Sequence, residues 1–143
     1  MVLYAKDIVE PDFISLKGEV NALEAARMMK SKSHGFVIVE SEDRRPKGIV
    51  TEWDYISKVV AEGKDPSKVS LAEIMSGNLL TVKASDGIDQ VAHVMAERGV
   101  RRVLVLENGK ILGAITAKTV LGRLQEYIDR ISGQIARLNS PTF

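Results

Sequence analysis

Gly48-Ile-Val-Thr-Glu-Trp-Asp54 recurs in altered form as Gly113-Ala-Ile-Thr-Ala-Lys-Thr119. In both copies a glycine and two apolar residues, which suit a short buried strand, precede a threonine, and the residues after it have the period of a helix. Thr51 and Thr116 are therefore expected at strand-to-helix junctions. Backbone N–H groups at the start of a helix lack partners and attract anions such as phosphate, so both junctions are candidate binding sites.

The rest of the chain is duplicated around this segment. An offset of 66 positions places Ala92 on Ala26 and Met95 on Met29, and one extra residue within 41–47 then changes the offset to 65. Duplication over the whole length indicates two copies of one supersecondary unit.

Each copy contains the same order of predicted elements. Apolar residues at i, i+3, i+4 and i+7 indicate amphipathic helices, and continuous β-branched runs indicate buried strands. Each half is therefore predicted to fold as strand, helix, strand, strand, helix, which makes the fold class α/β (α+β). Strands are expected at 13–16, 36–39, 48–50, 79–82, 103–106 and 113–115, and helices at 22–29, 52–61, 71–75, 88–95 and 117–138.

Turn and cap residues mark the ends of several elements. Asn21, with Glu24 three residues later, predicts the start of the first long helix, and Ser85 or Asp86 is expected to cap its counterpart in the second half. Asn108-Gly109 is typical of a two-residue hairpin turn.

The composition is that of a soluble globular protein. Of the 143 residues, 45% are hydrophobic and 27% are charged, and the net charge of +1 gives no reason to expect nucleic acid or an anionic membrane as a partner. The absence of cysteine excludes disulfides and thiolate chemistry. No secretory leader follows Met1, and no apolar run reaches the roughly 18 residues of a membrane helix, so a cytoplasmic location is expected.

No residue pattern indicates catalysis. The chain has two histidines, without the carboxylate spacing of a metal site or a nucleophilic triad. The glycine-rich phosphate loops of nucleotide enzymes do not occur, and Thr51 has no base beside it in the sequence. We therefore expect a protein that is not an enzyme and needs no metal or cofactor.

The last predicted helix carries a heptad seam, with apolar residues spaced 3, 4, 3, 4, 3. One interpretation is that this face packs on its own half of the chain; the other is that its distal part pairs with a second subunit. The seam consists of Leu121, Leu124, Ile128, Ile131, Ile135 and Leu138.

A duplicated unit of this size, with Gly-h-h-Thr-x-x-Asp closing its third strand, resembles the cystathionine-β-synthase (CBS) domain, and two in tandem resemble a Bateman module. The likeness covers residues 7–131. Besides the two glycine–threonine segments, the lead-ins Asp7-Ile8-Val9 and Glu73-Ile74-Met75 carry it.

The resemblance implies two CBS repeats packed as a pseudo-twofold pair, with a cleft that offers two adenine-nucleotide sites. It also implies a regulatory rather than a catalytic role. The implied domains are CBS domain 1 at 1–66, CBS domain 2 at 67–131, and the helix end and tail at 132–143.

Asp54 is the first candidate for the nucleotide site. By resemblance its carboxylate would accept hydrogen bonds from both ribose hydroxyls, while Thr51 and nearby N–H groups meet the phosphate. Thr51 and Asp54 also have the spacing of a capping box, and the two roles are compatible. Trp53 would cover the mouth of the cleft or pack in a subunit interface.

The second copy departs from the pattern because Thr119 stands in place of the aspartate. A threonine has one hydroxyl and no charge, so it cannot hold a ribose diol in the same way. We therefore expect one dominant site. The second would be empty, weak, or occupied by a ligand held through Thr116 and Lys118.

Three of the remaining candidates precede buried strands. Arg101 and Arg102 are expected to bind phosphate, although a solvated surface pair is the alternative. His34 occupies the equivalent place in the first copy, as a structural residue or as a ligand contact. The resemblance also implies that Ile14 and Ser15 flank the adenine, although core residues would have the same composition.

The sequence thus predicts a module that binds AMP, ADP or ATP between its repeats, with S-adenosylmethionine as a further candidate, and that modulates an unidentified partner as a homodimer. One alternative is a protein–protein interaction scaffold with an unoccupied cleft. The other is a nucleic-acid binder that uses Arg101, Arg102 and Lys118, which the near-neutral charge disfavours.

Overall fold

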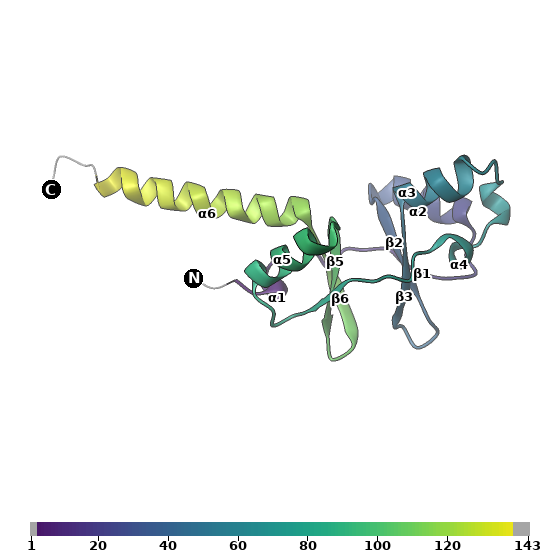
Figure 1. Cartoon of the computed structure of the whole chain (residues 1–143), viewed down its shortest axis with the longest axis horizontal. Coiled ribbons are helices and arrows are strands. Elements are labelled where there is room, and N and C mark those ends of the chain that lie inside the picture. Colours follow the sequence, from purple (N-terminus) through teal and green to yellow (C-terminus); the bar gives the residue numbers. More distant parts are fainter. Residues whose placement is uncertain (1–2, 139–143) are drawn as a thin grey trace.

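The computed structural model describes residues 3–138 and contains two three-stranded sheets, one from each half of the chain (Figure 1). Each sheet has one parallel and one antiparallel strand pair. The predicted fold class, a mixed α/β pair of βαββα repeats, is confirmed. The strands are β1 (Ser15–Lys17), β2 (Phe36–Glu40), β3 (Pro46–Thr51), β4 (Thr81–Lys83), β5 (Arg102–Glu107) and β6 (Lys110–Thr116).

The five predicted helices form, and the structure adds two short helical turns that were not predicted, at Ala5–Ile8 and Pro66–Lys68. The expected helix 52–61 forms, but its second part, η1 (Ile56–Val60), is a π-helix. The other helices are α1 (Ala5–Ile8), α2 (Ala22–Lys32), α3 (Glu52–Tyr55), the 3₁₀ turn η2 (Pro66–Lys68), α4 (Leu71–Ile74), α5 (Ile88–Arg98) and α6 (Ala117–Leu138).

The two sheets repeat the same pairing. Ser15 pairs with Ile38 between parallel β1 and β2, and Thr81 pairs with Leu104 between parallel β4 and β5. Both partners shift by the 66-position offset of the sequence repeat, so the duplication of sequence is a duplication of structure. The hairpin turn at Asn108-Gly109 also forms as predicted, with positive φ at both residues.

Two caps were predicted, and one of them is wrong. The Asn21 side chain accepts a hydrogen bond from the Glu24 N–H at 2.8 Å and caps α2. In the second half, Gly87 is the N-cap of α5, not Ser85 or Asp86. The Asp86 carboxylate instead accepts from the Lys83 N–H at 2.8 Å, which closes the turn after β4.

Each repeat has its own hydrophobic core, and a third cluster joins the two sheets. The joining cluster has buried side chains from both halves, so the repeats share apolar surface rather than only touching. Its buried members are Phe36, Ile38, Leu104 and Ala114, with Phe13, Ile49, Leu79 and Ile111 packed against them.

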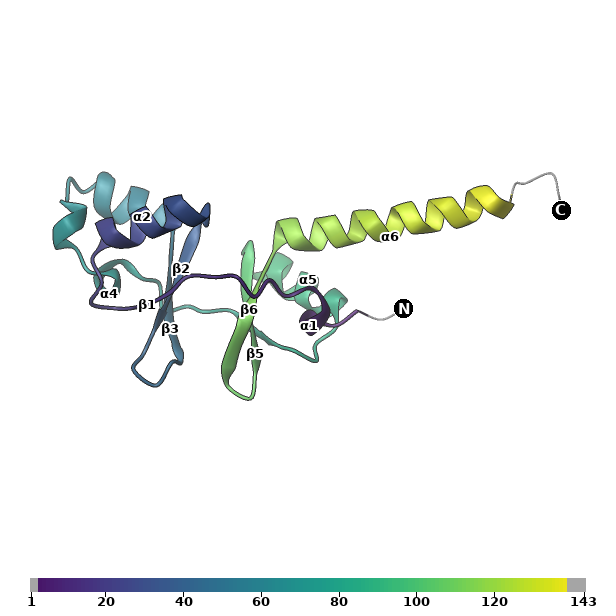
Figure 2. The ribbon, with the colours of Figure 1, turned by 180° about the vertical axis from the view of Figure 1, so that it is seen from behind.

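The short lead-in helices are exchanged between the repeats. Ala5 and Ile8 of α1 are buried in the core of the second repeat, and Leu71 and Ile74 of α4 are buried in the core of the first. The chain therefore crosses between the sheets twice, once after α1 and once after α4 (Figures 1 and 2). The predicted boundary after residue 66 divides the sequence repeat, whereas the packing crosses it.

The glycine that begins each repeated segment lets these lead-ins approach the third strand of the other unit. A Cβ at Gly113 would lie 2.0 Å from the Glu10 carbonyl oxygen, and a Cβ at Gly48 would lie 2.6 Å from the Met75 sulfur. Both distances are too short for real contacts. Glycine therefore allows the paired backbone bridges Glu10–Ala114 and Ile49–Ser76 to form.

Helix α6 begins beside α5 and then extends away from both repeats (Figures 1 and 2). None of the residues from Ala117 to Leu138 is buried. The distal seam therefore does not pack on its own repeat. Its exposed apolar side chains include Leu121 (65% exposed), Leu124 (50%), Ile128 (48%), Ile135 (54%) and Leu138 (78%).

Candidate functional site

Two cavities lie between the repeats. Each lies between the strand-to-helix junction of one repeat and the residues that follow the lead-in helix, α1 or α4, of the other repeat. The Asp54 cavity has a volume of about 410 Å³. It takes its junction from β3 and α3 and its other wall from the segment before β4 and the start of β5. Its lining includes Thr51, Trp53, Asp54, Ser76, Leu80 and Arg101.

The Thr119 cavity, of about 550 Å³, is the equivalent space on the other side of the pair. It takes its junction from β6 and α6, and its other wall from the segment after α1 and the start of β2. Its lining includes Glu10, His34, Arg101, Thr116, Lys118 and Thr119. Each of the two cavities therefore contains one of the junction threonines, Thr51 or Thr116.

Asp54 is buried at the floor of its cavity, with 6% of its surface exposed. Its Oδ2 accepts hydrogen bonds from the Thr51 N–H at 2.8 Å and the Thr51 hydroxyl at 3.3 Å, which forms the capping box. Its Oδ1 lies 2.9 Å from Lys58 Nζ. The helix start and the lysine together offset the cost of burying the carboxylate. A carboxylate oxygen can accept more than one hydrogen bond, so Oδ1 retains acceptor capacity beside Lys58.

In the second copy a hydroxyl network replaces this arrangement. Thr116 Oγ1 accepts from the Thr119 N–H at 3.2 Å and lies 2.9 Å from Thr119 Oγ1. The Thr119 hydroxyl in turn donates to Oε1 of Glu10, from the lead-in that follows α1. The Thr116 hydroxyl therefore caps the start of α6, and the carboxylate at this junction comes from another part of the chain.

Arg101 and Arg102 line both cavities, as a phosphate-binding role requires. Arg102 already has partners in the other repeat: its Nη2 lies 3.0 Å from Glu52 Oε1, and its guanidinium lies 5.3 Å from the centre of the Phe36 ring. Arg101 has no ion pair among residues 3–138. It is therefore the more available of the two cations.

His34 and Trp53 lie in different cavities. His34 lines the Thr119 cavity, and its Nε2 is 3.4 Å from Asp12 Oδ2. Trp53 lines the Asp54 cavity and is 67% exposed, so its ring lies at the cavity mouth.

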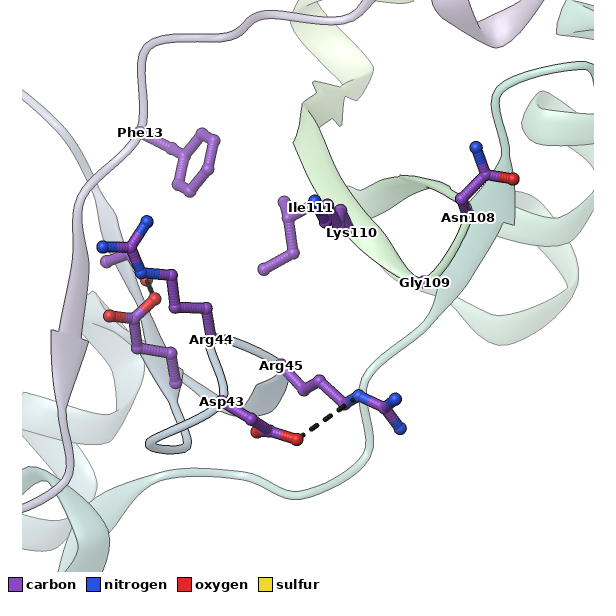
Figure 3. A pocket seen from close by; sticks show the side chains of 10 residues that line it. Phe13, Asp43, Arg44, Arg45, Asn108, Gly109, Lys110 and Ile111 are labelled. Atoms are coloured by element: carbon purple, nitrogen blue, oxygen red, sulfur yellow. Dashed lines mark hydrogen bonds and ion pairs between the residues drawn. The ribbon is translucent and has the colours of Figure 1, made fainter.

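Ile14 and Ser15 line neither of these cavities. Ile14 is buried in the core of the first repeat, and Ser15 donates a hydrogen bond to Glu40 at 2.8 Å. In this part of the chain, Glu10 and Asp12 line the Thr119 cavity instead, because Ile14 and Ser15 are committed to the core and the sheet. Ser15 lines a separate cavity of about 680 Å³ between the two hairpin loops, where Phe13 and Ile111 face each other (Figure 3).

Glu10 and Ser76 are the site residues that the sequence analysis missed. They are equivalent positions under the 66-residue offset, and each lines one cavity. The offset itself was the available signal, since it places a carboxylate and a hydroxyl at matching lead-ins. The match of Glu10 with Ser76 could not be interpreted from the sequence, because each residue lines a cavity only as a result of the exchange of α1 and α4.

Two negative observations apply to residues 3–138. In this part of the chain, no group of three or more histidine or acidic side chains is arranged to hold a metal ion. Also within these bounds, no helix has the length and apolar character needed to cross a membrane.

The two sheets, the exchanged lead-ins and the paired cavities define a tandem pair of βαββα repeats. The chain belongs to the CBS domain family, because the family model for the CBS domain matches it twice, at residues 5–61 and 71–126. The resemblance noted in the sequence is thereby confirmed.

Known proteins share both sequence and fold with this chain. An uncharacterized protein of Methanopyrus kandleri is 33% identical over 123 residues, which cover 85% of this chain and 62% of that relative. A structure of the hexameric CBS-CP12 protein from bloom-forming cyanobacteria is 34% identical, with a TM-score of 0.77, and the match covers 85% of this chain and 67% of that one.

A third similar structure contains ligands. The CBS domain pair of protein MJ0100, in complex with 5′-methylthioadenosine and S-adenosyl-L-methionine, is 25% identical to this chain, with a TM-score of 0.76. The match covers 88% of this chain and 98% of that pair.

Proposed function

We propose that this chain is a regulatory module that binds an adenosine ligand in the Asp54 cavity. AMP, ADP and ATP are the first candidates, and S-adenosylmethionine is a further one. The observation that carries the proposal is the Asp54 carboxylate, which is buried at a helix start and lines the cavity. A ribose diol supplies two hydroxyl donors, which an ionised carboxylate accepts as charge-assisted hydrogen bonds.

The other walls suit the rest of such a ligand. Leu80 and the exposed Trp53 ring offer apolar surface for a base, and Arg101 offers a cation for a phosphate. The ligands of the similar MJ0100 pair, both adenosine derivatives, support the same class of ligand here.

A thermal-shift and calorimetry screen tests the proposal. The wild-type chain is titrated with AMP, ADP, ATP, S-adenosylmethionine and 5′-methylthioadenosine, and at least one of these should raise the melting temperature and give a binding isotherm. Asp54→Asn should lower the affinity for that ligand about 10-fold or more, because a charged acceptor is lost.

The control is Glu62→Gln, which changes an exposed carboxylate in the turn after η1. It should leave binding unchanged. Each shift is measured against the ligand-free melting temperature of the same variant, because Asp54→Asn also weakens a cap. If none of the five compounds binds the wild type, the scaffold alternative replaces the proposal.

We further propose that two copies associate through the exposed seam of α6, which would link ligand binding to the arrangement of a partner protein. The seam faces solvent along a helix of 22 residues. The positions that flank it are uncharged, since they are occupied by Gln125, Tyr127, Ser132 and Gln134. A second copy of the helix would therefore meet the seam without repulsion between like charges.

Ligand binding would act on the regulated partner only if the ligand prefers one arrangement of the repeats over another. The Thr51 and Thr116 junctions belong to different repeats and share Arg101 and Arg102 between their cavities. A ligand phosphate that binds these arginines would alter the contact between the repeats. Through α6, this change would alter the geometry of the dimer.

A further inference from the structure

The Thr119 cavity has lost the aspartate of the repeated segment, yet a carboxylate is present at its junction. Glu10 reaches the Thr119 hydroxyl from the lead-in after α1, on the opposite segment of the chain. Its backbone is held by two hydrogen bonds to Ala114, the residue after Gly113, at 2.9 and 3.1 Å. Its position is therefore set by β6 itself and not by a free loop.

The first cavity shows the same pair of groups with their places exchanged. Asp54 supplies a carboxylate from the junction helix, and Ser76 supplies a hydroxyl from the lead-in. In the second cavity, Thr119 supplies the hydroxyl from the junction helix, and Glu10 supplies the carboxylate from the lead-in.

The exchange is exact in register. The lead-in bridges are Ile49–Ser76 in one cavity and Glu10–Ala114 in the other, and both members shift by the offsets of the sequence repeat. The two carboxylates therefore approach equivalent junctions from opposite walls.

The Glu10 carboxylate is also less engaged than that of Asp54. Lys58 neutralises Asp54, but the equivalent residue Arg123 binds Glu126 at 3.3 Å instead. Among residues 3–138, Oε2 of Glu10 has no hydrogen-bond or ion-pair partner. A ligand with two neighbouring hydroxyls could therefore donate to it without first displacing a lysine.

Cations line the same cavity. Arg101 and Lys118 line it and have no ion pair within the described part of the chain, whereas Arg102 is paired with Glu52 and His34 lies beside Asp12. A carboxylate and two unpaired cations in one cavity suit a molecule that carries a diol at one point and an anionic group at another.

We propose that the Thr119 cavity is a second ribonucleotide site, in which Glu10 replaces the missing aspartate and binds the ribose hydroxyls. This inference deepens the proposed function and rests on it. It replaces the expectation of one dominant site, which followed from the residue at position 119 alone.

Calorimetric titration with AMP tests the inference. The wild-type chain should bind two AMP molecules, and Glu10→Gln should weaken one of the two sites by about 10- to 100-fold, the effect of removing a charged acceptor. Asp54→Asn should weaken the other site. Glutamine can still accept from Thr119, so the ligand-free melting temperature of Glu10→Gln should match that of the wild type.

Two further variants distinguish a ligand contact from a structural role. Thr119→Asp alone places a second carboxylate beside Glu10. The repulsion between these two like charges should lower the affinity of this site for AMP. Combining it with Glu10→Ser reproduces the arrangement of the first cavity and should restore binding. A purely structural role of Glu10 predicts no such rescue.

The diol itself is tested with 2′-deoxy-AMP, which lacks one hydroxyl. It should bind the second site of the wild type more weakly than AMP, and Glu10→Gln should reduce this difference. The inference is wrong if Glu10→Gln leaves the number and affinities of the AMP sites as in the wild type. If one AMP site is found and responds only to Asp54→Asn, the proposed function stands without it. If the wild type binds none of the screened compounds, both fail.

Discussion

Nη2 of Arg102, at the start of β5, lies 3.0 Å from Oε1 of Glu52, at the start of α3, so an ion pair joins the two repeats. Arg102 is largely covered, since 20% of its side chain is exposed, and it packs on the Phe36 ring. One of the two arginines that line both cavities is thus partly neutralised before any ligand arrives.

Releasing this arginine should favour ligands that carry phosphate. In Glu52→Gln, AMP should bind a few-fold more tightly than in the wild type, because Arg102 no longer has a competing carboxylate. Adenosine, which has no phosphate, should bind as before. Calorimetry with both compounds measures the contrast, and equal changes for AMP and adenosine would rule out this explanation. Because Glu52 is half exposed, protein stability should change by no more than about 1 kcal/mol.

The glycine at the head of the second repeated segment should not tolerate a side chain. Gly113→Ala would place Cβ 2.0 Å from the Glu10 carbonyl oxygen, so the bridge to the lead-in must break or β6 must move. We expect a loss of about 2 kcal/mol or more in the free energy of unfolding, measured by urea denaturation.

Gly122→Ala is the matched control for that substitution. Gly122 lies within α6 and would have no atom within 4 Å of an added Cβ. Alanine should therefore raise stability by about 0.5–1 kcal/mol, through its higher helix propensity. Similar losses in both variants would mean that the close approach at Gly113 is unimportant.

Tyr55 should make stability depend on pH in the alkaline range. Its hydroxyl donates to the Ala22 carbonyl at 2.7 Å, and burial raises the pKa of Tyr55 from 10.0 to about 12. The folded state therefore disfavours the phenolate. The stabilisation is complete below pH 10 and is lost as the pH rises from about 10 to about 12.

Tyr55→Phe isolates this contribution. It should cost about 1 kcal/mol at pH 7, the value of a typical hydrogen bond, and the gap to the wild type should narrow above pH 10. Denaturation midpoints for both chains between pH 8 and 11.5 measure the gap. A constant gap over this range would contradict the raised pKa of Tyr55.

The seam of α6 predicts a dimer that a single charged substitution in the seam should dissociate. Ile128→Asp places a carboxylate at the centre of the seam and should convert the chain to a monomer, while Asp129→Asn, at a position outside the seam, should not. Sedimentation measures the mass of each. A wild type that stays monomeric at high micromolar concentration would contradict the proposed pairing.

Much of the fold could be predicted because its signals are local. The periodicity around Met29 and Met95, the apolar runs of β2 and β5, and the Asn108-Gly109 turn each depend on a few neighbouring residues. The π-helical turn at Ile56–Val60 and the cap at Gly87 were missed, because they depend on hydrogen bonds that no local pattern specifies.

The candidate site was predictable only in part, for a different reason. Thr51, Asp54 and the arginines belong to continuous motifs, and all of them line cavities. Ile14 and Ser15 were placed beside the adenine by the family resemblance, but Ile14 belongs to the core and Ser15 to β1. The contribution of Glu10 required knowledge of a long-range crossing that brings it to Thr119, 109 positions away.

The exchange of α1 and α4 has a consequence for how such a chain came to exist. A lone ancestral repeat would have left the places of Ala5 and Ile8, or of Leu71 and Ile74, unfilled by its own residues. Two copies could fill these places only by exchanging their first helices, as in a domain-swapped dimer. Gene fusion would then have joined the two copies with their first helices still exchanged. Neither half is therefore expected to fold alone if the chain is cut between residues 61 and 71.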